Sequence, residues 1–587
     1  MTSSADAAFD LVIAGALLFD GDGDEGRLAD VGVRAGKVAA ITDSGGLGAA
    51  VAEARLEGAG LWLPPGFIDL HTHYDAEVEA APALLESLRH GVTTVMLGSC
   101  SISAAVGEPE DIADIFCRVE GIPRSLLLPL LQARKDWQTF PGYLDHLATL
   151  PLGPNVAAYV GHSNLRMAAM GFARSLQAGV GPTAAESATM TGWLEEALDA
   201  GYVGLSAQTL PWDKLDGSRE RSKPLPATFA SWRERRALAQ ILRRRGRVFQ
   251  GVPDLVTKFN VLLFLWESVG LWRPRLRTTV ISWMDLVGDR TVDPLIRTLL
   301  FVFRRLLGAE FRFQALPNPF EVRADGMDLV IFEEFAAGAE ALHLADLGQR
   351  ADLLRDEGFR QRFLQQWQAL FSPRVYHRDL RRTEILSCPD TALVGRSFAE
   401  VAAARSTSPA LAFLDLCAEH GASLRWHSVV ANDRPDVLAA LVAHPGVLIG
   451  FSDAGAHLRN MAFYDFPLRL LRLCMRQRQA GKPALGVGRA IQRVTSEIAD
   501  FYRIDAGRVR VGCRADLVLL DPQALSEGES QIEEVAMPAF GGLRRMVNRE
   551  PGVVQAVVVG GRLALRHDQP DAALGRERGF GVVLRAA

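Results

Sequence analysis

The stretch that decides the fold is "LPPGFIDLHTHYDAE", residues 63–77. An apolar run beginning at Gly66 ends in two histidines, His71 and His73, and alternate side chains of an extended chain point to the same face. A histidine pair at the end of a buried strand is typical of a metal site, because imidazole is a common ligand of Zn²⁺. The stretch therefore predicts the first strand of a metal-binding barrel.

Short apolar segments alternate with helical stretches through the middle of the chain, which is the pattern of parallel βα units. Eight such units predict an α/β fold, a closed (β/α)8 TIM-like barrel whose chemistry lies at the C-terminal ends of the strands. The strands that we expect are residues 66–73, 91–100, 155–163, 201–207, 247–251, 278–283, 423–428 and 446–455.

Both ends of the chain contain β-branched runs cut by Gly and Asp. They predict a small composite β-sandwich domain from residues 1–62 and 506–587, beside a barrel of residues 63–505. A mostly helical insertion is expected at about 286–400. Within it, residues 294–308 place four apolar side chains at helical spacing, which favours a helix packed on the barrel over a membrane-surface or lipid-binding helix. These four are Leu295, Leu299, Phe303 and Leu306.

The composition is that of a globular protein. Of 587 residues, 48% are hydrophobic and 23% charged, and the formal net charge of -5 is spread along the chain. This balance predicts a small-molecule partner and no nucleic acid. No segment reaches the roughly 18 apolar residues of a spanning helix, and no basic region precedes the first apolar residues. The six cysteines form no CxxC pair, so we expect a cytoplasmic protein without a transmembrane segment.

Two further side chains are expected at the barrel mouth. Cys100 follows the second strand in "MLGSCSIS", where a thiolate can bind the same ion, although a lone cysteine is more often a small buried apolar residue. Asp453 follows the eighth strand in "GFSDAGAH" and should face the histidine pair, because the first and last strands of a barrel are neighbours. His457 would contact substrate or cap the loop.

The sequence segments around these residues resemble those of a known family. The chain is similar to the amidohydrolase superfamily and, within it, to the N-acyl-D-amino-acid deacylases, which include the D-aminoacylases. The likeness runs through "PGFIDLHTHYDAE", "NVAAYVGHSNLRM", "ALDAGYVGLSAQTLPW", "GFSDAGAH", "VRVGCRADLVLLDP" and "PGVVQAVVVGGRLALR". Its most specific segment is "GVTTVMLGSCSIS", whose cysteine separates this branch from relatives with a carboxylated lysine. The resemblance implies a β-sandwich with a barrel, a Zn²⁺ site and amide hydrolysis.

Carried over by residue, the resemblance implies that His71 and His73 are the first-strand metal pair and that Cys100 is the metal-binding cysteine. Asp453 would be the ligand that also acts as general base and acid. The family has a further histidine at the end of strand five and another at the end of strand six. This sequence has Gln250 near the first place, and Ser282 and Trp283 near the second.

A glutamine amide is a poor Zn²⁺ ligand beside imidazole, so we expect one ion in preference to two. Three outcomes are open: an enzyme with a single ion, substitution by another histidine such as His162 or His427, or loss of activity. The retained Asp453 favours the single-ion enzyme. Gln250 and His457 remain candidates for a substitute ligand or a substrate contact.

The predicted function is hydrolysis of the amide bond of an N-acyl amino acid. Metal-activated water would attack, with Asp453 as general base and then general acid. Arg166 and Arg378 are candidates to bind a substrate carboxylate. One alternative is a cyclic amidohydrolase of the hydantoinase or dihydropyrimidinase kind. The presence of Cys100 argues against this alternative. Another is a catalytically silent barrel that binds a ligand, which the missing histidines motivate. The oligomeric state is left open.

Overall fold

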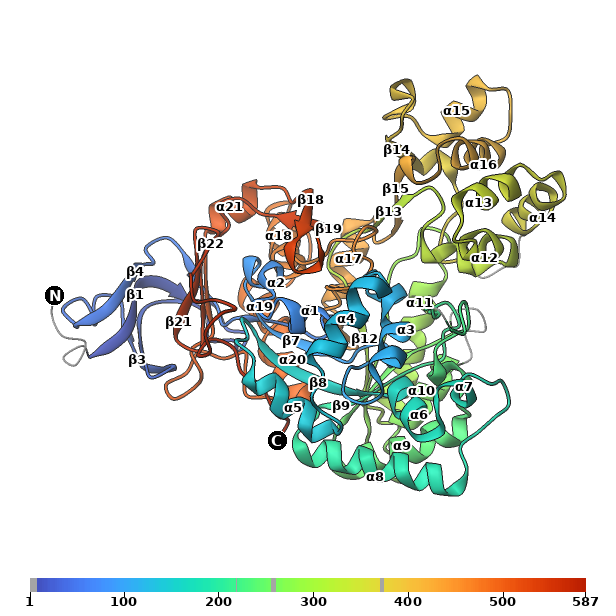
Figure 1. Ribbon diagram of the computed structural model, residues 1–587. Coiled ribbons are helices and arrows are strands. Elements are labelled where there is room, and N and C mark those ends of the chain that lie inside the picture. Colours follow the sequence, from blue (N-terminus) through green and yellow to red (C-terminus); the bar gives the residue numbers. More distant parts are fainter. Residues whose placement is uncertain (1–7, 218, 255–259, 370–373) are drawn as a thin grey trace.

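The computed structural model describes residues 8–217, 219–254, 260–369 and 374–587. Its centre is an eight-stranded parallel sheet whose strands follow one another in chain order (Figure 1). The strands are β6 (Phe67–Asp69), β7 (Val92–Leu97), β8 (Asn155–Gly161), β9 (Gly204–Gln208), β10 (Val248–Val252), β11 (Arg277–Val280), β12 (Phe311–Ala315) and β16 (Val447–Ile449).

The first and last strands of this sheet meet beyond their C-terminal ends. Thr72 forms a parallel bridge with Ala454. The His73 amide donates to the carbonyl of Ala454 at 2.7 Å, and the Asp453 amide donates to the carbonyl of His71 at 3.2 Å. These contacts join the two edges of the sheet, as closure into a barrel requires. They also bring the histidine pair against Asp453.

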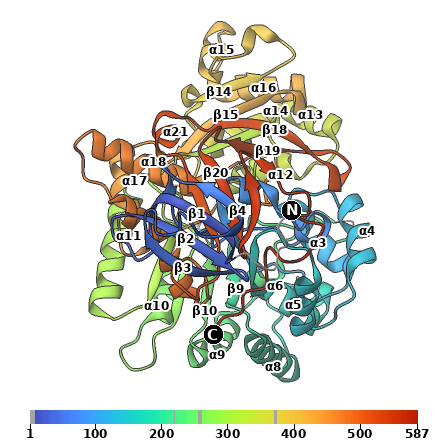
Figure 2. The ribbon, with the colours of Figure 1, turned by 90° about the vertical axis from the view of Figure 1, so that its left-hand side faces the viewer.

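Helices surround the sheet (Figures 1 and 2). They share one large apolar core with the strands. Helix α8 shows how the sequence sets the ends of such a helix. Thr183 and Glu186 form a capping box at its start, and Gly201 ends it with φ 106°. No helix of the described residues has the length and apolar character to cross a bilayer. The surrounding helices include α5 (Phe140–Thr149), α8 (Ala184–Ala200), α9 (Trp232–Arg245), α10 (Asn260–Ser268), α11 (Val292–Leu300), α17 (Pro435–Val442) and α18 (Phe466–Gln479).

Strands from both ends of the chain form one nine-stranded sheet beside the barrel (Figure 1). The two ends are joined where Leu520 pairs with Trp62, and the sheet has an apolar core of its own. Its path is β22 (Gln569–Pro570), β21 (Arg562–Arg566), β20 (Val554–Val559), β17 (Leu517–Leu520), β5 (Trp62–Leu63), β1 (Phe9–Leu18), β2 (Arg27–Arg34) and β3 (Lys37–Asp43), with β4 (Ala52–Glu57) paired to β1.

A separate unit rises from the barrel between β12 and β16 (Figure 1). It has its own core, in which Phe332, Phe413 and Trp426 pack together. Its three-stranded antiparallel sheet joins β13 (Phe320–Asp325), β15 (Arg425–Ala431) and β14 (Thr383–Ser387). Its helices are α12 (Ala336–His343), α13 (Leu347–Arg355), α14 (Glu357–Gln368), α15 (Phe398–Ala404) and α16 (Pro409–His420).

The prediction that residues 423–428 form a barrel strand is wrong, because they contribute to β15 of this inserted unit. The seventh barrel strand is β12, which lies inside the stretch expected to be the insertion. Parallel barrel strands are usually continuous apolar runs, but β12 reads "FRFQA". Arg312 pairs with Glu497 on its outer side, while the Gln314 side chain reaches the barrel mouth.

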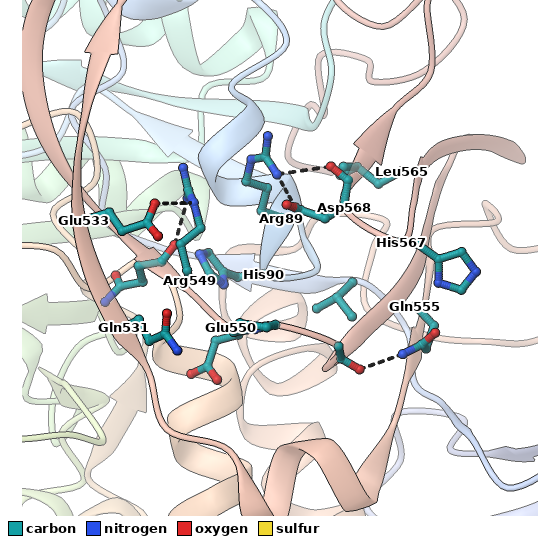
Figure 3. A pocket seen from close by; sticks show the side chains of 14 residues that line it. Arg89, His90, Gln531, Glu533, Arg549, Glu550, Gln555, Leu565, His567 and Asp568 are labelled. Atoms are coloured by element: carbon teal, nitrogen blue, oxygen red, sulfur yellow. Dashed lines mark hydrogen bonds and ion pairs between the residues drawn. The ribbon is translucent and has the colours of Figure 1, made fainter.

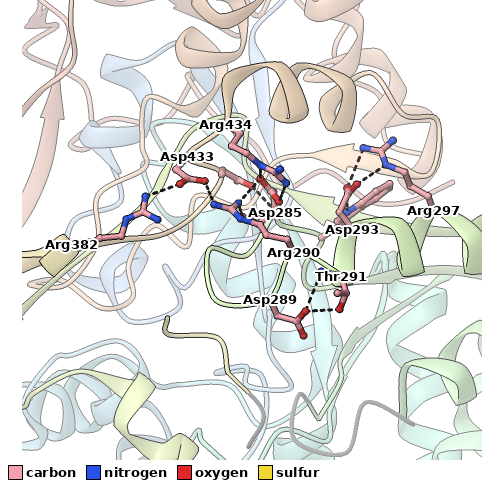
Figure 4. A network of polar contacts seen from close by, with 11 residues as sticks. Asp285, Asp289, Arg290, Thr291, Asp293, Arg297, Arg382, Asp433 and Arg434 are labelled. Carbon is pink, nitrogen blue, oxygen red and sulfur yellow. Dashed lines mark hydrogen bonds and ion pairs between the residues drawn. The ribbon is translucent and has the colours of Figure 1, made fainter. Parts of the chain in front are cut away.

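A network of charges links the inserted unit to the loop after β11 (Figure 4). The buried Asp285 carboxylate binds Arg290 at 2.7 Å and Arg434 at 2.6 Å. Asp433 binds Arg290 at 2.7 Å and Arg382 at 2.8 Å. Because Asp433 and Arg434 directly follow β15, the network fixes the end of that strand against the barrel.

We expect Asp285→Asn to lower the free energy of unfolding by about 2 to 3 kcal/mol, since two guanidinium groups lose a buried counter-charge. The control is Asp436→Asn, because the Asp436 carboxylate is 61% exposed and its pairing with Lys482 contributes less than about 1 kcal/mol. Thermal melting of both variants checks this. Equal melting temperatures would show that the network adds nothing to stability.

Candidate metal centre

The histidine pair is buried at the barrel mouth. The extended chain beyond β6 directs His71 and His73 to the same side, with ring centroids 5.3 Å apart. The His71 amide donates to Asp69 Oδ1 at 3.2 Å, and the His71 ring packs edge-on against Phe451. Both imidazoles are shielded from water, so their nitrogens need partners from the protein or from a ligand.

Cys100 lies beside the pair, on the loop after β7. Its Sγ is 3.3 Å from His71 Nε2, and its backbone is in the left-handed region with φ 51°. The loop is held by Asp75, which accepts hydrogen bonds from the amides of Gly98 (3.0 Å) and Ala104 (3.3 Å). Asp75 therefore positions the segment that carries the thiol, and not a histidine ring.

Asp453 approaches from the loop after β16. Its Oδ1 lies 3.2 Å from His73 Nε2 and 3.6 Å from His71 Nε2. Like Cys100, it has a left-handed backbone, with φ 58°. Left-handed conformations cost energy for residues other than glycine and are concentrated at functional sites. Two strained residues therefore face the same imidazole from opposite strands.

The donor set fits a zinc ion. The described part of the chain contains one group of three metal-binding side chains whose ligand atoms all lie within 4.8 Å of one another, and it consists of His71, His73 and Cys100. Tetrahedral zinc with sulfur, nitrogen and oxygen ligands separates neighbouring ligand atoms by roughly 3.3 to 3.6 Å. The contacts of His71 Nε2 with Cys100 Sγ (3.3 Å) and Asp453 Oδ1 (3.6 Å) match that spacing.

Two glutamine side chains support this group. His71 Nδ1 lies 2.8 Å from Gln314 Oε1, an oxygen that can only accept, so Nδ1 carries the proton. The lone pair of Nε2 is then directed at Cys100 and Asp453, as a metal ligand requires. Gln250 Oε1 accepts a hydrogen bond from the Cys100 amide at 3.2 Å. Gln250 therefore lies where the sequence placed it, and it fixes the cysteine loop.

The electrostatics of the site favour a bound cation. Burial raises the pKa of the Cys100 thiol well above its usual range, and the carboxylates of Asp213 and Asp453 raise it further. Burial lowers the pKa of His71 to about 4. Burial alone would raise the pKa of Asp453, but hydrogen bonding to His73 and the charges of the nearby histidines hold it below its usual value. A metal ion would stabilise the Cys100 thiolate, which burial and the neighbouring carboxylates disfavour.

The other candidate residues lie elsewhere. His162 Nε2 contacts Glu234 at 2.8 Å, and Glu234 also binds Arg166. His427 belongs to the inserted unit, with Nε2 3.5 Å from Glu384. The structure brings neither histidine into the metal group. At the end of strand six, the buried Trp283 donates its indole N–H to Asp293 of α11 at 3.0 Å, outside the group.

A cavity of about 340 Å³ opens beside the group, between the barrel mouth and the inserted unit. His457 lines it, with Nε2 3.7 Å from Asp453 Oδ2. Asp213, from the loop after β9, lines it too. The Gln208 amide, in the orientation that satisfies both partners, donates to Asp213 Oδ2 at 3.0 Å and to the Cys100 carbonyl at 2.9 Å. Gln208 thus contacts both Cys100 of the metal group and Asp213 of the cavity wall.

Sequence reasoning missed Gln208, Asp213 and Gln314. Gln314 was not predicted, because β12 was not recognised as a barrel strand. The signal for Gln208 and Asp213 was their position directly after the fourth predicted strand, in "SAQTLPWD", since polar residues at that end of a barrel strand serve the site.

A second cavity, of about 480 Å³, lies apart from the metal group (Figure 3). It is formed by the hairpin of β18 (Gln531–Met537) and β19 (Leu543–Arg549) with the terminal sheet. Its arginines are already held by carboxylates: Arg89 by Asp568, and Arg549 by Glu86 and Glu533. This cavity does not contribute to the metal group.

The chain matches known proteins along most of its length. The model of the amidohydrolase family matches residues 398–564. An uncharacterised protein of Mycobacterium tuberculosis is 45% identical over 565 residues, which are 96% of this chain and 92% of that protein. The N-acyl-D-aspartate deacylase of Alcaligenes xylosoxydans xylosoxydans is 40% identical over 206 residues, which are 35% of this chain and 38% of that enzyme.

Among solved structures, the N-acyl-D-glutamate deacylase of Bordetella bronchiseptica, in complex with zinc and a phosphonate inhibitor, has a TM-score of 0.61 at 24% identity. The match covers 98% of this chain and 100% of that one. The chain belongs to the amidohydrolase superfamily, a class of hydrolases that act on carbon–nitrogen bonds other than peptide bonds. The predicted TIM-like barrel with an additional domain is confirmed, and so is the resemblance to D-aminoacylases.

We expect Gln314→Leu to weaken zinc binding by 10- to 100-fold, roughly the usual effect of losing a partner that orients a histidine ligand. Gln361→Leu is the control, because Gln361 is exposed on α14 and its amide donates to Glu357, far from the metal group. Competition with a chelator measures both affinities. Unchanged affinity in Gln314→Leu would exclude this glutamine from the support of the site.

We expect acid sensitivity from Glu234. Burial alone would raise its pKa, but His162 and Arg166 lower it from 4.5 to about 2. A lowered carboxyl pKa stabilises the fold above the unfolded value, so this contribution of about 3 kcal/mol at most is lost as the pH falls from 4.5 towards 2. Burial also lowers the pKa of His162, which acts in the same direction.

Urea denaturation of wild type and Glu234→Gln at decreasing pH checks this expectation. The variant should start less stable at neutral pH and lose less stability on acidification. Parallel pH profiles of the two proteins would contradict it.

Proposed function

We propose that this chain is a single-zinc hydrolase that cleaves the amide bond of an N-acyl amino acid, as its deacylase relatives do for N-acyl-D-amino acids. The observation that carries the proposal is the meeting of His71, His73 and Cys100 with Asp453 at one end of the barrel. A bound Zn²⁺ supplies Lewis-acid polarisation of the scissile carbonyl and lowers the pKa of water.

Asp453 performs the proton transfers in this proposal. Its low pKa keeps it ionised, so it can accept a proton from the attacking water and deliver it to the leaving nitrogen. His73, 3.2 Å from Oδ1, fixes the carboxylate on the side of the metal group. His457, 3.7 Å from Oδ2, does so on the side of the cavity. The Asp453 carboxylate therefore bridges the two halves of the site.

The proposal of one ion rests on what surrounds the group. The places of the strand-five and strand-six histidines of the family hold Gln250 and Trp283. Gln250 is engaged with the Cys100 amide, and Trp283 with Asp293. Neither offers a charged or imidazole ligand, so a second ion would have Cys100 as its only strong donor from this set.

The cavity beside Asp453 combines apolar side chains with charges of both signs, because Asp213, Asp216 and Asp328 line it as well as arginines. Leu329 and Leu342 of the inserted unit can contact an acyl chain, whereas Arg118 and Arg221 are paired with Glu333 and Asp216. Arg166 and Arg378, the cations expected from the sequence, instead bind Glu234 and Glu334. A substrate carboxylate in this cavity would therefore share Arg118 or Arg221 with the carboxylate that already binds it.

Asp453→Asn should lower kcat for N-acyl-D-amino acid hydrolysis by about 10²- to 10⁴-fold, because the amide cannot accept and return a proton. His427→Asn is the matched control, since His427 lies on the inserted sheet. A panel of N-acyl D- and L-amino acids, with hydantoin and dihydrouracil as ring substrates, measures the activity.

Circular dichroism confirms that the variants remain folded. Full activity of Asp453→Asn would refute its catalytic role. Turnover of the ring substrates alone would replace the proposed substrate class.

A further inference from the structure

Exposed apolar side chains gather on one outer face of the barrel. Of the 14 large apolar side chains that are exposed in the described residues, eight fall between residues 262 and 306, whereas the other six are scattered along the chain. Contiguous exposed apolar surface marks interaction sites, and scattered exposed residues do not. On α10 and the loop that follows it, these are Leu262, Leu263, Trp266, Leu271 and Trp272. On α11 and η2 (Phe301–Leu306), they are Leu295, Phe301 and Leu306.

The two groups belong to one surface, which we call the α10–η2 face. The Glu310 amide donates to the carbonyl of Ser268 at 3.3 Å. A Cβ on Gly270 would lie 3.3 Å from the carbonyl oxygen of Gly308. The C-terminal ends of α10 and η2 therefore touch.

Packing on the barrel does not account for this face. Of the helical stripe expected at 294–308, Leu299 and Phe303 do pack against the barrel core. Leu295 remains 53% exposed and Leu306 59%, and Trp272 in the neighbouring loop is 83% exposed. The helix therefore has a second apolar side, directed to solvent.

The charge on the α10–η2 face is positive. Arg275 and Arg305 are exposed and have no ion-pair partner among the residues that the structure describes. The Arg275 guanidinium lies by Gly308, next to the end of η2. The neighbouring carboxylates are engaged: Glu267 is buried against Arg243, Asp293 binds Arg297, and Glu310 binds Arg277. Within the described part of the chain, Arg275 and Arg305 are thus two unpaired cations that border the exposed Trp272 and Leu306.

We propose that the α10–η2 face docks this protein onto an anionic lipid bilayer. Tryptophan and leucine side chains enter the boundary between headgroups and acyl chains, and arginine side chains reach the phosphates. A symmetric contact with a second copy would bring together two faces of the same positive charge, because the partly exposed Glu310 carboxylate is already paired with Arg277. Charge complementarity therefore selects the bilayer.

The part of the face formed by Trp272 and Leu306 lies away from the metal group. The loop with Trp272 leads into β11, and Leu306 precedes β12, so both lie at the N-terminal ends of barrel strands. The metal group lies at the opposite ends. Docking led by Trp272 and Leu306 would hold the enzyme on a membrane while its cavity stays open to substrate from the water phase.

Vesicle co-sedimentation of the full chain tests the proposal. We expect binding to phosphatidylcholine vesicles that contain phosphatidylglycerol, weaker binding at high salt, and little binding to phosphatidylcholine alone. Trp272→Ser with Leu306→Ser should weaken binding by at least about tenfold. Arg275→Gln and Arg305→Gln should each weaken it by about fivefold. Leu347→Ser and Val511→Ser, exposed apolar residues outside the face, serve as matched controls and should bind like wild type.

Sedimentation velocity of the same proteins tests the alternative, in which a second copy of the chain covers the α10–η2 face. The proposal would be overturned if wild type self-associates and fails to bind anionic vesicles, whether or not Trp272→Ser dissociates the assembly. Equal vesicle binding by the face variants and the controls would overturn it as well. Unchanged hydrolytic activity and circular dichroism of the variants would show that any lost binding reflects the surface and not the fold.

Discussion

The site depends on one constraint, the joining of the first barrel strand to the last. The hydrogen bonds from His73 to Ala454 and from Asp453 to His71 hold two segments together that are almost 400 residues apart in the chain. They place a carboxylate 3.2 Å from an imidazole in a buried pocket. Without barrel closure, the candidate metal ligands and Asp453, the proposed general base, would not meet.

Two glutamine amides support the candidate metal group. Gln314 fixes the tautomer of His71, and Gln250 fixes the loop of Cys100. An amide supports a ligand through hydrogen bonds but adds no charge and little affinity for zinc. In the proposed single-ion enzyme, Gln250 therefore supports the Cys100 loop and supplies no charged ligand for a second ion.

The residues that meet at the barrel mouth were easier to predict than the order of the strands. His71, His73, Cys100 and Asp453 could be placed because each directly follows an apolar strand, and closure of a barrel brings such ends together. The strand β12 was missed because its alternating "FRFQA" lacks the usual apolar run, and β15 was mistaken for it because a buried antiparallel strand has the same composition. Gln314 was lost with β12. The partners of His162 and His427 were not predictable, because they come from Glu234 and Glu384, on other elements.

The most direct test of the central claim is anomalous diffraction at the zinc edge from crystals grown with zinc. A single site with one zinc per chain predicts one peak, bounded by His71 Nε2, His73 Nε2, Cys100 Sγ and the Asp453 carboxylate. Two peaks at the barrel mouth, or one peak bound by Cys100 without the histidine pair, would contradict it.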